Sequence, residues 1–318
     1  MRDLGPYGGL GAWIDVYDFA AAYQSPGVEP PLSVADLDDM ARRGVKTVFV
    51  QAARWDDQSP EGIVDAPVLG SLLIRAHALG MRVVGWYLPR FDDIDRDLAR
   101  SMLIQDFRAD GQQFDGLAID IEYTQGVGDP VQRNDALVRY SQALRARVGD
   151  APVAAVVLTA VHLEVINPRF WPDFPYRALR DLYDVWMPMA YWTVRADPYK
   201  DGYRYVKESV DRLRTDLGQP DVPVAPVGGV ADEVTNEQMA GYAKALADTG
   251  AVGGSLYDWN TMAPGKQAFL AQLFSHGPAA SLPVPPAVKR HPAPDPPPGT
   301  GPGATAGGAE PPPQQPVP

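Results

Sequence analysis

Two carboxylates separated by one residue, inside an otherwise apolar run, are the clearest chemical feature of this sequence. Asp120 and Glu122 close the segment Asp115-Gly-Leu-Ala-Ile-Asp-Ile-Glu122. Because side chains alternate between the two faces of a β-strand, Asp120 and Glu122 share one face with Ala118. Carboxylates on a buried face are costly unless they are used or well paired. Two that lie close together raise the pKa of one, which is what a general acid near neutral pH requires.

The segments that would position this pair are apolar, β-rich runs separated by helical stretches. Their starts lie roughly 30–40 residues apart, the size of one βαβ unit. The runs are residues 12–17, 47–52, 82–88, 116–121, 153–160, 185–191, 222–227 and 254–257. Several are almost continuously apolar, which is typical of parallel strands that are covered on both faces. Eight such units predict a (β/α)8 TIM barrel, although a doubly wound open sheet would give similar local signals.

Helix signals occupy the intervals between these runs. The predicted helices include residues 34–43, 69–78, 134–148 and 239–248. Glycines follow each of them, as at Gly44 and Gly250, where a helix commonly ends. Thr235 and Gln238 have the spacing of a capping box before the last of these helices. In a barrel of this kind the active site lies at the carboxyl ends of the strands, where Asp120 and Glu122 stand.

One composition boundary divides the chain. The 318 residues are 45% hydrophobic, which suffices for a barrel of roughly 250 residues. From residue 278 the sequence turns to Pro, Ala and Gly, and nearly half of the 33 prolines fall in this last part. Such a segment cannot bury enough apolar area to offset its ordering entropy. We therefore expect a catalytic-type barrel over residues 1–277 and a disordered tail over residues 278–318.

The net charge of the chain limits the classes of partner that we expect it to bind. A formal net charge of −12 repels phosphate backbones and anionic lipid headgroups, so nucleic acid is a poor partner and neutral sugars fit better. No run of about 18 apolar residues predicts a membrane span. The N-terminal residues lack the apolar core of a signal peptide. We expect either a cytoplasmic protein or a secreted or cell-surface protein whose leader has been removed. The oligomeric state stays open.

Neither a cofactor nor a metal is expected. The chain has no cysteine, which excludes disulfides and thiolate ligands, and its four histidines show no metal-ligand spacing. Gly8-Gly-Leu-Gly11 precedes the first predicted strand, which is the wrong context for a nucleotide-binding loop.

The carboxylate segment resembles the fourth-strand signature of family 18 chitinases, Asp-x-x-Asp-x-Asp-x-Glu. Asp115, Asp120 and Glu122 match it, and Ala118 stands in place of the middle Asp. By this resemblance Glu122 would be the general acid. Asp120 would orient the N-acetyl group of the substrate and stabilise the cyclic oxazolinium that forms when this group attacks the sugar, a substrate-assisted route.

Two further segments resemble the same family. Met189-Ala-Tyr191 resembles the end of its sixth strand, where a Tyr hydroxyl holds the N-acetyl oxygen. Trp192 stands where the family often has Asp, and we expect it at the substrate site. Gly253 to Trp259 resembles the eighth strand, whose Trp forms the apolar floor under the sugar. The Ser-x-Gly-Gly pattern of the family is absent, and residues 48–54 stand in that place.

A second resemblance, to family 25 lysozymes, brings in the first predicted strand. These enzymes carry an Asp on their first strand and Asp-x-Glu on a middle one, which Asp15 and the pair Asp120 and Glu122 would match. Asp15 would then join the substrate site. We also expect Tyr87, near the end of the third run, to contact substrate, whereas alternation directs Asp258 away from the site.

Three hypotheses follow. The leading one is a glycosidase that cleaves a polysaccharide or glycoconjugate containing N-acetylhexosamine, with Glu122 as general acid. The alternative is a non-catalytic, chitinase-like carbohydrate-binding barrel, which the substitution at Ala118 favours. The third is a barrel with other carboxylate chemistry, such as a metal-dependent lyase in which Asp15, Asp120 and Glu122 offer oxygen ligands to a hard cation.

Overall fold

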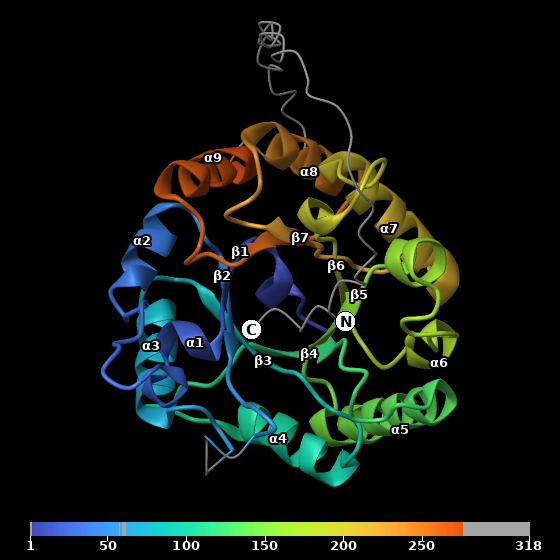
Figure 1. Cartoon of the computed structure of the whole chain (residues 1–318). Helices are drawn as coiled ribbons and strands as arrows, with labels where there is room; N and C mark the ends of the chain where they lie inside the picture. Colours follow the sequence, from blue (N-terminus) through green and yellow to red (C-terminus); the bar gives the residue numbers. More distant parts are fainter. Residues whose placement is uncertain (1, 57, 59–61, 276–318) are drawn as a thin grey trace, which may run out of the picture. The chain divides into compact units, whose positions relative to one another are not determined.

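The computed structural model describes residues 2–56, 58 and 62–275. In this part of the chain eight parallel strands close into a barrel in chain order, with the helices outside it (Figure 1), so the predicted (β/α)8 TIM barrel is confirmed. The strands are β1 (Gly9–Ile14), β2 (Thr47–Gln51), β3 (Arg82–Tyr87), β4 (Gly116–Ile121), β5 (Val153–Leu158), β6 (Val185–Met189), β7 (Val227–Val230) and β8 (Gly253–Tyr257). The predicted tail, residues 278–318, lies outside the described residues.

The helices follow the strands in the order that the sequence predicts. The α-helices are α1 (Val16–Phe19), α2 (Asp36–Arg42), α3 (Ala66–Ala78), α4 (Ile94–Asp106), α5 (Pro130–Val148), α6 (Tyr176–Leu179), α7 (Gly202–Leu217), α8 (Asn236–Thr249) and α9 (Pro264–Ser275). Short helical turns add η1 (Gly5–Tyr7), η2 (Ala21–Tyr23), η3 (His162–Ile166) and η4 (Trp192–Val194). Among the described residues, no helix combines the length and the hydrophobicity that a membrane span requires.

The ends of α8 show how local sequence sets these boundaries. Thr235 accepts a hydrogen bond from the Gln238 amide, and the Gln238 side chain accepts one from the Thr235 amide, which is the predicted capping box. Gly250 ends the helix in the left-handed conformation, with φ of 62°.

Strand β7 lies further along the chain than its sequence predicts. Residues 222–227 were expected to form it, but it spans Val227–Val230, and Val224 makes only an isolated bridge to Trp186. The sequence hid the strand because Gly228 and Gly229 are poor strand formers. The packing requires them: a Cβ on Gly228 would lie 2.4 Å from the Leu256 side chain.

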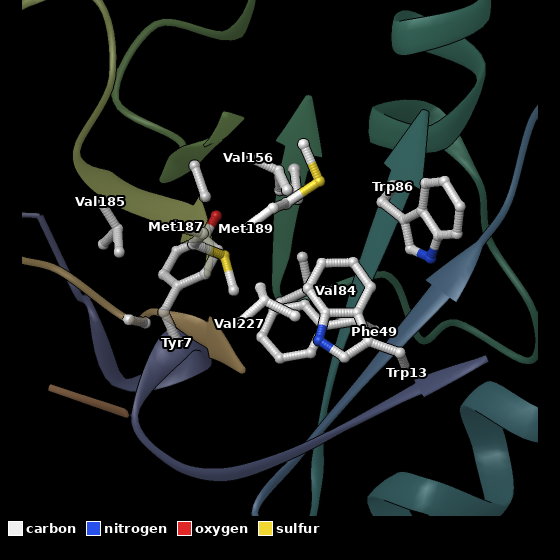
Figure 2. Close-up of a cluster of buried hydrophobic side chains, with 13 residues drawn as sticks. Tyr7, Trp13, Phe49, Val84, Trp86, Val156, Val185, Met187, Met189 and Val227 are labelled. Carbon is white, nitrogen blue, oxygen red and sulfur yellow. The ribbon is translucent and has the colours of Figure 1, made fainter. Parts of the chain in front are cut away.

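Side chains from the strands fill the barrel interior with a cluster of buried hydrophobic residues (Figure 2). Trp13 stacks on Phe49 with ring centroids 4.6 Å apart and packs edge-on against Trp86. At the other end the hydroxyl of Tyr7 lies 2.9 Å from the carbonyl oxygen of Leu117. The interior below the mouth is therefore a packed apolar core, and polar chemistry is confined to the carboxyl ends of the strands.

Candidate active site

The end of β4 carries the two carboxylates as alternation predicts. Ala118 belongs to the interior core, so Asp120 and Glu122, two and four residues on, face the same side. Asp120 is 9% exposed, and its Oδ1 has no hydrogen-bond partner among the described residues. Glu122 retains some solvent-accessible surface at the mouth although protein surrounds its carboxyl group on almost every side. The pair thus lies where the barrel core meets the open mouth.

Burial raises the pKa of both carboxyl groups. The pKa of Glu122 rises to about 7 because burial penalises its charged form. The pKa of Asp120 is raised well above its ordinary value, first by burial and then by the charge of Glu122. Because the two groups titrate together, the proton belongs to the pair rather than to either residue. Near neutral pH the mouth therefore holds a carboxylic acid that can donate a proton.

Tyr191 brings a hydroxyl to this pair from the end of β6. Its pKa is raised by burial and then by the charges of Glu122 and Asp120, which places the hydroxyl close to both carboxyl groups. The Tyr191 ring lies 6.3 Å from that of Tyr257, centroid to centroid. A neutral tyrosine beside two carboxyl groups can donate a hydrogen bond to a substrate oxygen.

Tyr257, at the end of β8, is the site residue that the sequence reasoning missed. Its hydroxyl donates to Oδ2 of Asp15 over 2.8 Å, and its ring packs against Trp13 and Tyr191. The signal was available, because Tyr257 is two residues from Ser255, which accepts a hydrogen bond from Trp13 inside the barrel. Tyr257 therefore connects Asp15 to the face of the mouth that carries Tyr191.

Three buried aspartates gather beside Tyr257. One carboxylate oxygen each of Asp15, Asp18 and Asp258 lies within 4.8 Å of the other two. Burial raises the pKa of all three, and that of Asp18 reaches about 7, helped by the charge of Asp15. Among the described residues, this trio rather than Asp15 with Asp120 and Glu122 has the spacing to hold a hard cation.

The position of Asp258 corrects its predicted orientation. Strand β8 ends at Tyr257, so alternation does not extend to Asp258, and this carboxylate turns toward Asp15 while it accepts a hydrogen bond from the Thr261 amide. Asp15 lies at the mouth as expected, where its carboxylate accepts from the Tyr17 amide and caps α1.

The loops after β2, β3 and β4 add a wall of aromatic rings to the mouth. The guanidinium of Arg90 lies 4.1 Å from the ring centroid of Trp55 and 5.3 Å from that of Tyr123, the residue after Glu122. Asp92 pairs with Arg90 over 3.1 Å, so the stack is close to neutral. Flat rings held in this way suit the apolar faces of sugars.

Three predicted substrate contacts lie elsewhere. Tyr87 is fully buried outside the barrel, and its hydroxyl donates to Asp97 of α4 over 2.5 Å. Trp192 is also fully buried and packs on Tyr242 with ring centroids 5.4 Å apart. Trp259 is 4% exposed in the turn after β8. Tyr87 has the parity opposite to Trp86, which points inward, and Trp192 and Trp259 follow their strands, where alternation no longer applies.

Asp115 lies at the opposite end of β4. Its carboxylate accepts hydrogen bonds from the Val83 amide over 2.8 Å and from Arg82 over 2.7 Å, and lies 2.8 Å from Nε2 of His77. These contacts tie β3, β4 and α3 together at the closed end of the barrel. Asp115 therefore has a structural position, far along the strand from the mouth.

Comparisons with known proteins find similar folds among solved structures of low sequence identity. No protein-family model matches the chain, and no curated protein matches it in sequence. A GH18 chitinase variant from Cycas revoluta, solved in complex with (GlcNAc)4, has a TM-score of 0.61 at 11% identity over 84% of this chain and 99% of that chain.

Two other solved structures are similar to the same degree. A chitinase from Chromobacterium violaceum has a TM-score of 0.56 at 15% identity over 84% of this chain and 98% of its own. An endo-1,4-β-mannanase from Rhizomucor miehei has a TM-score of 0.61 at 9% identity over 87% and 96%. At these identities the likenesses show the barrel fold.

Proposed function

We propose that this protein is a glycosidase that cleaves a polysaccharide or glycoconjugate containing N-acetylhexosamine. One observation carries the proposal: Asp120 and Glu122 lie together at the barrel mouth, and burial raises the pKa of Glu122 to about 7. A carboxyl group that is protonated near neutral pH is what glycosidic bond cleavage needs as its general acid. The resemblance of this segment to family 18 chitinases and the glycosidase-like fold support the same reaction.

In the proposed reaction Glu122 donates its proton to the leaving glycosidic oxygen as the bond from this oxygen to the anomeric carbon breaks. The carbonyl oxygen of the substrate's own N-acetyl group attacks the anomeric carbon and forms a cyclic oxazolinium. Glu122, now a carboxylate, takes a proton from the water that opens the ring, which restores the acid. Asp120 and the Tyr191 hydroxyl orient the N-acetyl group, since both lie beside Glu122.

Other residues of the mouth would bind the sugar chain. Tyr257 and Tyr191 present adjacent rings, and the stack of Trp55, Arg90 and Tyr123 continues from Glu122 along the rim. Aromatic rings in a row favour a chain of several sugars over a single one, because each ring stacks on a separate residue of the chain. The Cycas revoluta structure was solved with a GlcNAc tetramer bound, which supports N-acetylated glycans as the first substrates to test.

The test replaces Glu122 by Gln, which preserves shape and removes the proton. We expect Glu122→Gln to lower kcat on N-acetylated glycans by on the order of 10²- to 10⁴-fold. We expect the wild-type rate to fall as pH rises above 7, because the Glu122 pKa of about 7 marks the loss of the acid. Glu237→Gln, an exposed residue of α8, is the matched control and should leave the rate unchanged. Equal cleavage by wild type and Glu122→Gln would refute the assignment.

A specific feature favours the second candidate, a non-catalytic carbohydrate-binding barrel. Ala118 is fully buried in the core beneath Asp120, where the chitinase signature has an Asp, and Oδ1 of Asp120 has no partner among the described residues. An aspartate without a fixed partner is held less firmly for catalysis. Calorimetric binding of N-acetylated oligosaccharides without release of reducing ends would select this candidate, and turnover would eliminate it.

A further inference from the structure

The helical ring of the barrel is thin between β5 and β6. Every residue of this interval is described, and its only α-helix is α6, which has four residues, whereas α5 and α7 on either side have 19 and 16. Figure 1 shows α6 as a short turn between these two long helices. The space left open is a pocket of about 800 Å³, lined by the segment from Leu163 to Ala178 and by Thr215 and Asp216 at the end of α7. Pockets of this size hold small organic ligands.

Two acidic side chains form the polar end of the pocket. Asp216 and Glu164 both line the pocket, and Glu164 acts on the titration of Asp216. Burial, followed by the contact with Glu164, raises the pKa of Asp216 to about 7. Oδ2 of Asp216 is buried and has no hydrogen-bond partner among the described residues. This oxygen is left without the donor that a buried acceptor normally has.

Tyr176 adds a second unpartnered atom at the same place. Its side chain is 6% exposed, and its hydroxyl has no hydrogen-bond partner within the described residues. Burial raises the Tyr176 pKa, and the charges of Asp216 and Glu164 raise it further. Two residues from separate elements, Tyr176 and Asp216, thus line one pocket and each carries an orphan polar atom, which points to a missing polar group of a ligand.

The arginines nearby do not meet this need. Arg212 lies 3.2 Å from Glu164 and 3.0 Å from Glu208, so its charge is divided between two acids. Arg177 donates to the carbonyl oxygen of Thr215. Both arginines lower the pKa of Asp216 only in part, since its net shift remains upward. Neither guanidinium therefore bonds to Oδ2 of Asp216 or to the Tyr176 hydroxyl among the described residues, although Arg177 is part of the pocket lining.

Apolar side chains form much of the remaining lining, which also contains Asp173, Arg177 and Thr215. Leu163, Pro168, Pro172 and Phe174 form its walls, with Phe174 packed on Tyr176 at a centroid distance of 4.6 Å. A hard metal ion would need about six oxygen ligands, more than these side chains offer. A ligand with a positively charged donor at one end and an apolar body at the other matches both parts of the pocket.

We infer that this pocket binds a small organic cation: a primary ammonium group attached to an apolar or aromatic body. The ammonium donates to Oδ2 of Asp216 and to the Tyr176 oxygen, and where Asp216 is protonated its proton passes to solvent as the ammonium binds. The body lies along the prolines and Phe174. Because the pocket is on the outer wall between α5 and α7, this inference is independent of the proposed glycosidase activity.

The test is isothermal titration calorimetry on the full chain with two probes of one shape, 2-phenylethylamine and 2-phenylethanol. We expect the amine to bind and the alcohol to bind at least about tenfold more weakly, because a hydrogen bond to a buried charge is worth more than a neutral one. Glucosamine, a cation without an apolar body, should also bind more weakly than phenylethylamine. Equal affinity for amine and alcohol, or no heat from the amine, would overturn the inference.

Two variants assign the binding to the pocket. Asp216→Asn and Tyr176→Phe each remove one acceptor and keep the shape, so each should weaken phenylethylamine binding, the first by about tenfold or more. Asp211→Asn, on the exposed side of α7 where Asp211 pairs with Lys207, is the matched control and should bind like wild type. Asp216→Asn should not lower Tm, since it relieves a buried acid pair, so loss of binding cannot be attributed to unfolding. Unchanged binding by both variants would place the amine elsewhere and refute the inference.

Discussion

At the scale of single residues, Tyr257 is more important to the barrel mouth than the amino-acid sequence suggests. This side chain bonds to Asp15 on one side and packs on Tyr191 on the other. The hydrogen bond is also one of the contacts that lower the pKa of Asp15 against the opposing effect of burial. Tyr257 is therefore the link between the aspartate group and the Asp120–Glu122 pair.

Replacing Tyr257 by Phe tests this link. We expect Tyr257→Phe to destabilise the protein by about 1 kcal/mol, because Asp15 keeps its burial but loses a donor. In a glycan-cleavage or glycan-binding assay the variant should also be weaker than wild type. Tyr203→Phe removes a tyrosine–aspartate hydrogen bond of equal length, 2.8 Å, at the exposed surface, and should change neither Tm nor glycan binding. If the two variants behave alike, Tyr257 has no special role at the mouth.

The residues that sequence could and could not locate differ in where they stand on a strand. Asp120 lies within β4, and Glu122 is the first residue after this strand, so alternation was enough to orient both side chains. Trp192, Asp258 and Trp259 lie beyond the ends of β6 and β8, where the chain turns and the period of two no longer holds. The position of Trp192 depends on packing against Tyr242, a contact between distant parts of the chain, and that of Asp258 on a turn hydrogen bond from the Thr261 amide.

At the scale of elements, the loop after β4 is fixed by its contact with the loop after β3. A Cβ on Gly126 would lie 2.1 Å from the carbonyl oxygen of Arg90, so the two backbones touch at this residue. The contact holds Tyr123 in place against the guanidinium of Arg90. Sequence could not indicate this role, because a glycine in a polar loop is normally explained by turn formation alone.

Gly126→Ala should separate the two loops. The clash is with backbone, which cannot move aside cheaply, so we expect a loss of roughly 1–3 kcal/mol in the free energy of unfolding and weaker glycan binding at the rim. Gly128→Ala is the control from the same loop, because a Cβ there meets nothing within 4 Å. Urea unfolding of both variants measures the difference. A Gly126→Ala protein as stable as Gly128→Ala would show that the loops do not depend on this contact.

Sequence predicted the order of the elements better than their extents. Eight runs predicted eight strands because several of the runs are almost continuously apolar, which is typical of a covered parallel sheet. The position of β7 escaped because Gly228 and Gly229 are selected by close packing against Leu256 and Trp192, not by strand propensity. The shortness of α6 creates the pocket beside Asp216, a feature that a strand count does not reveal.

At the scale of the whole molecule, the buried acids set the pH at which the barrel is most stable. Burial raises the pKa values of Asp18, Glu122 and Asp216 to about 7, far above those of exposed carboxyl groups. A group whose pKa is raised on folding contributes stability that is present at low pH and lost as pH rises through the folded value. His162 acts in the opposite sense: burial lowers its pKa to about 4, so its contribution is lost as pH falls below about 6.5.

These signs predict a decline in stability between pH 6.5 and 8. Towards the upper end of this window His162 is neutral in the unfolded state as well as in the folded one, so the buried acids, with Asp18, Glu122 and Asp216 among them, dominate the exchange of protons with folding. The free energy of unfolding should then fall by on the order of 1 kcal/mol per pH unit. Urea unfolding at pH 6.5, 7.25 and 8 measures the slope.

Asp18→Asn removes one of the three acids, while the side-chain oxygen of the new residue can still accept a hydrogen bond from the Asp15 amide. The slope should therefore become shallower, and the free energy of unfolding of the variant should rise relative to that of the wild type as pH increases. Asp36→Asn, where Asp36 is exposed at the start of α2, is the control and should keep the wild-type slope. A stability that rises from pH 6.5 to 8 would mean that these acids are ionised without cost in the folded protein, and the acid role of Glu122 would lose its physical basis.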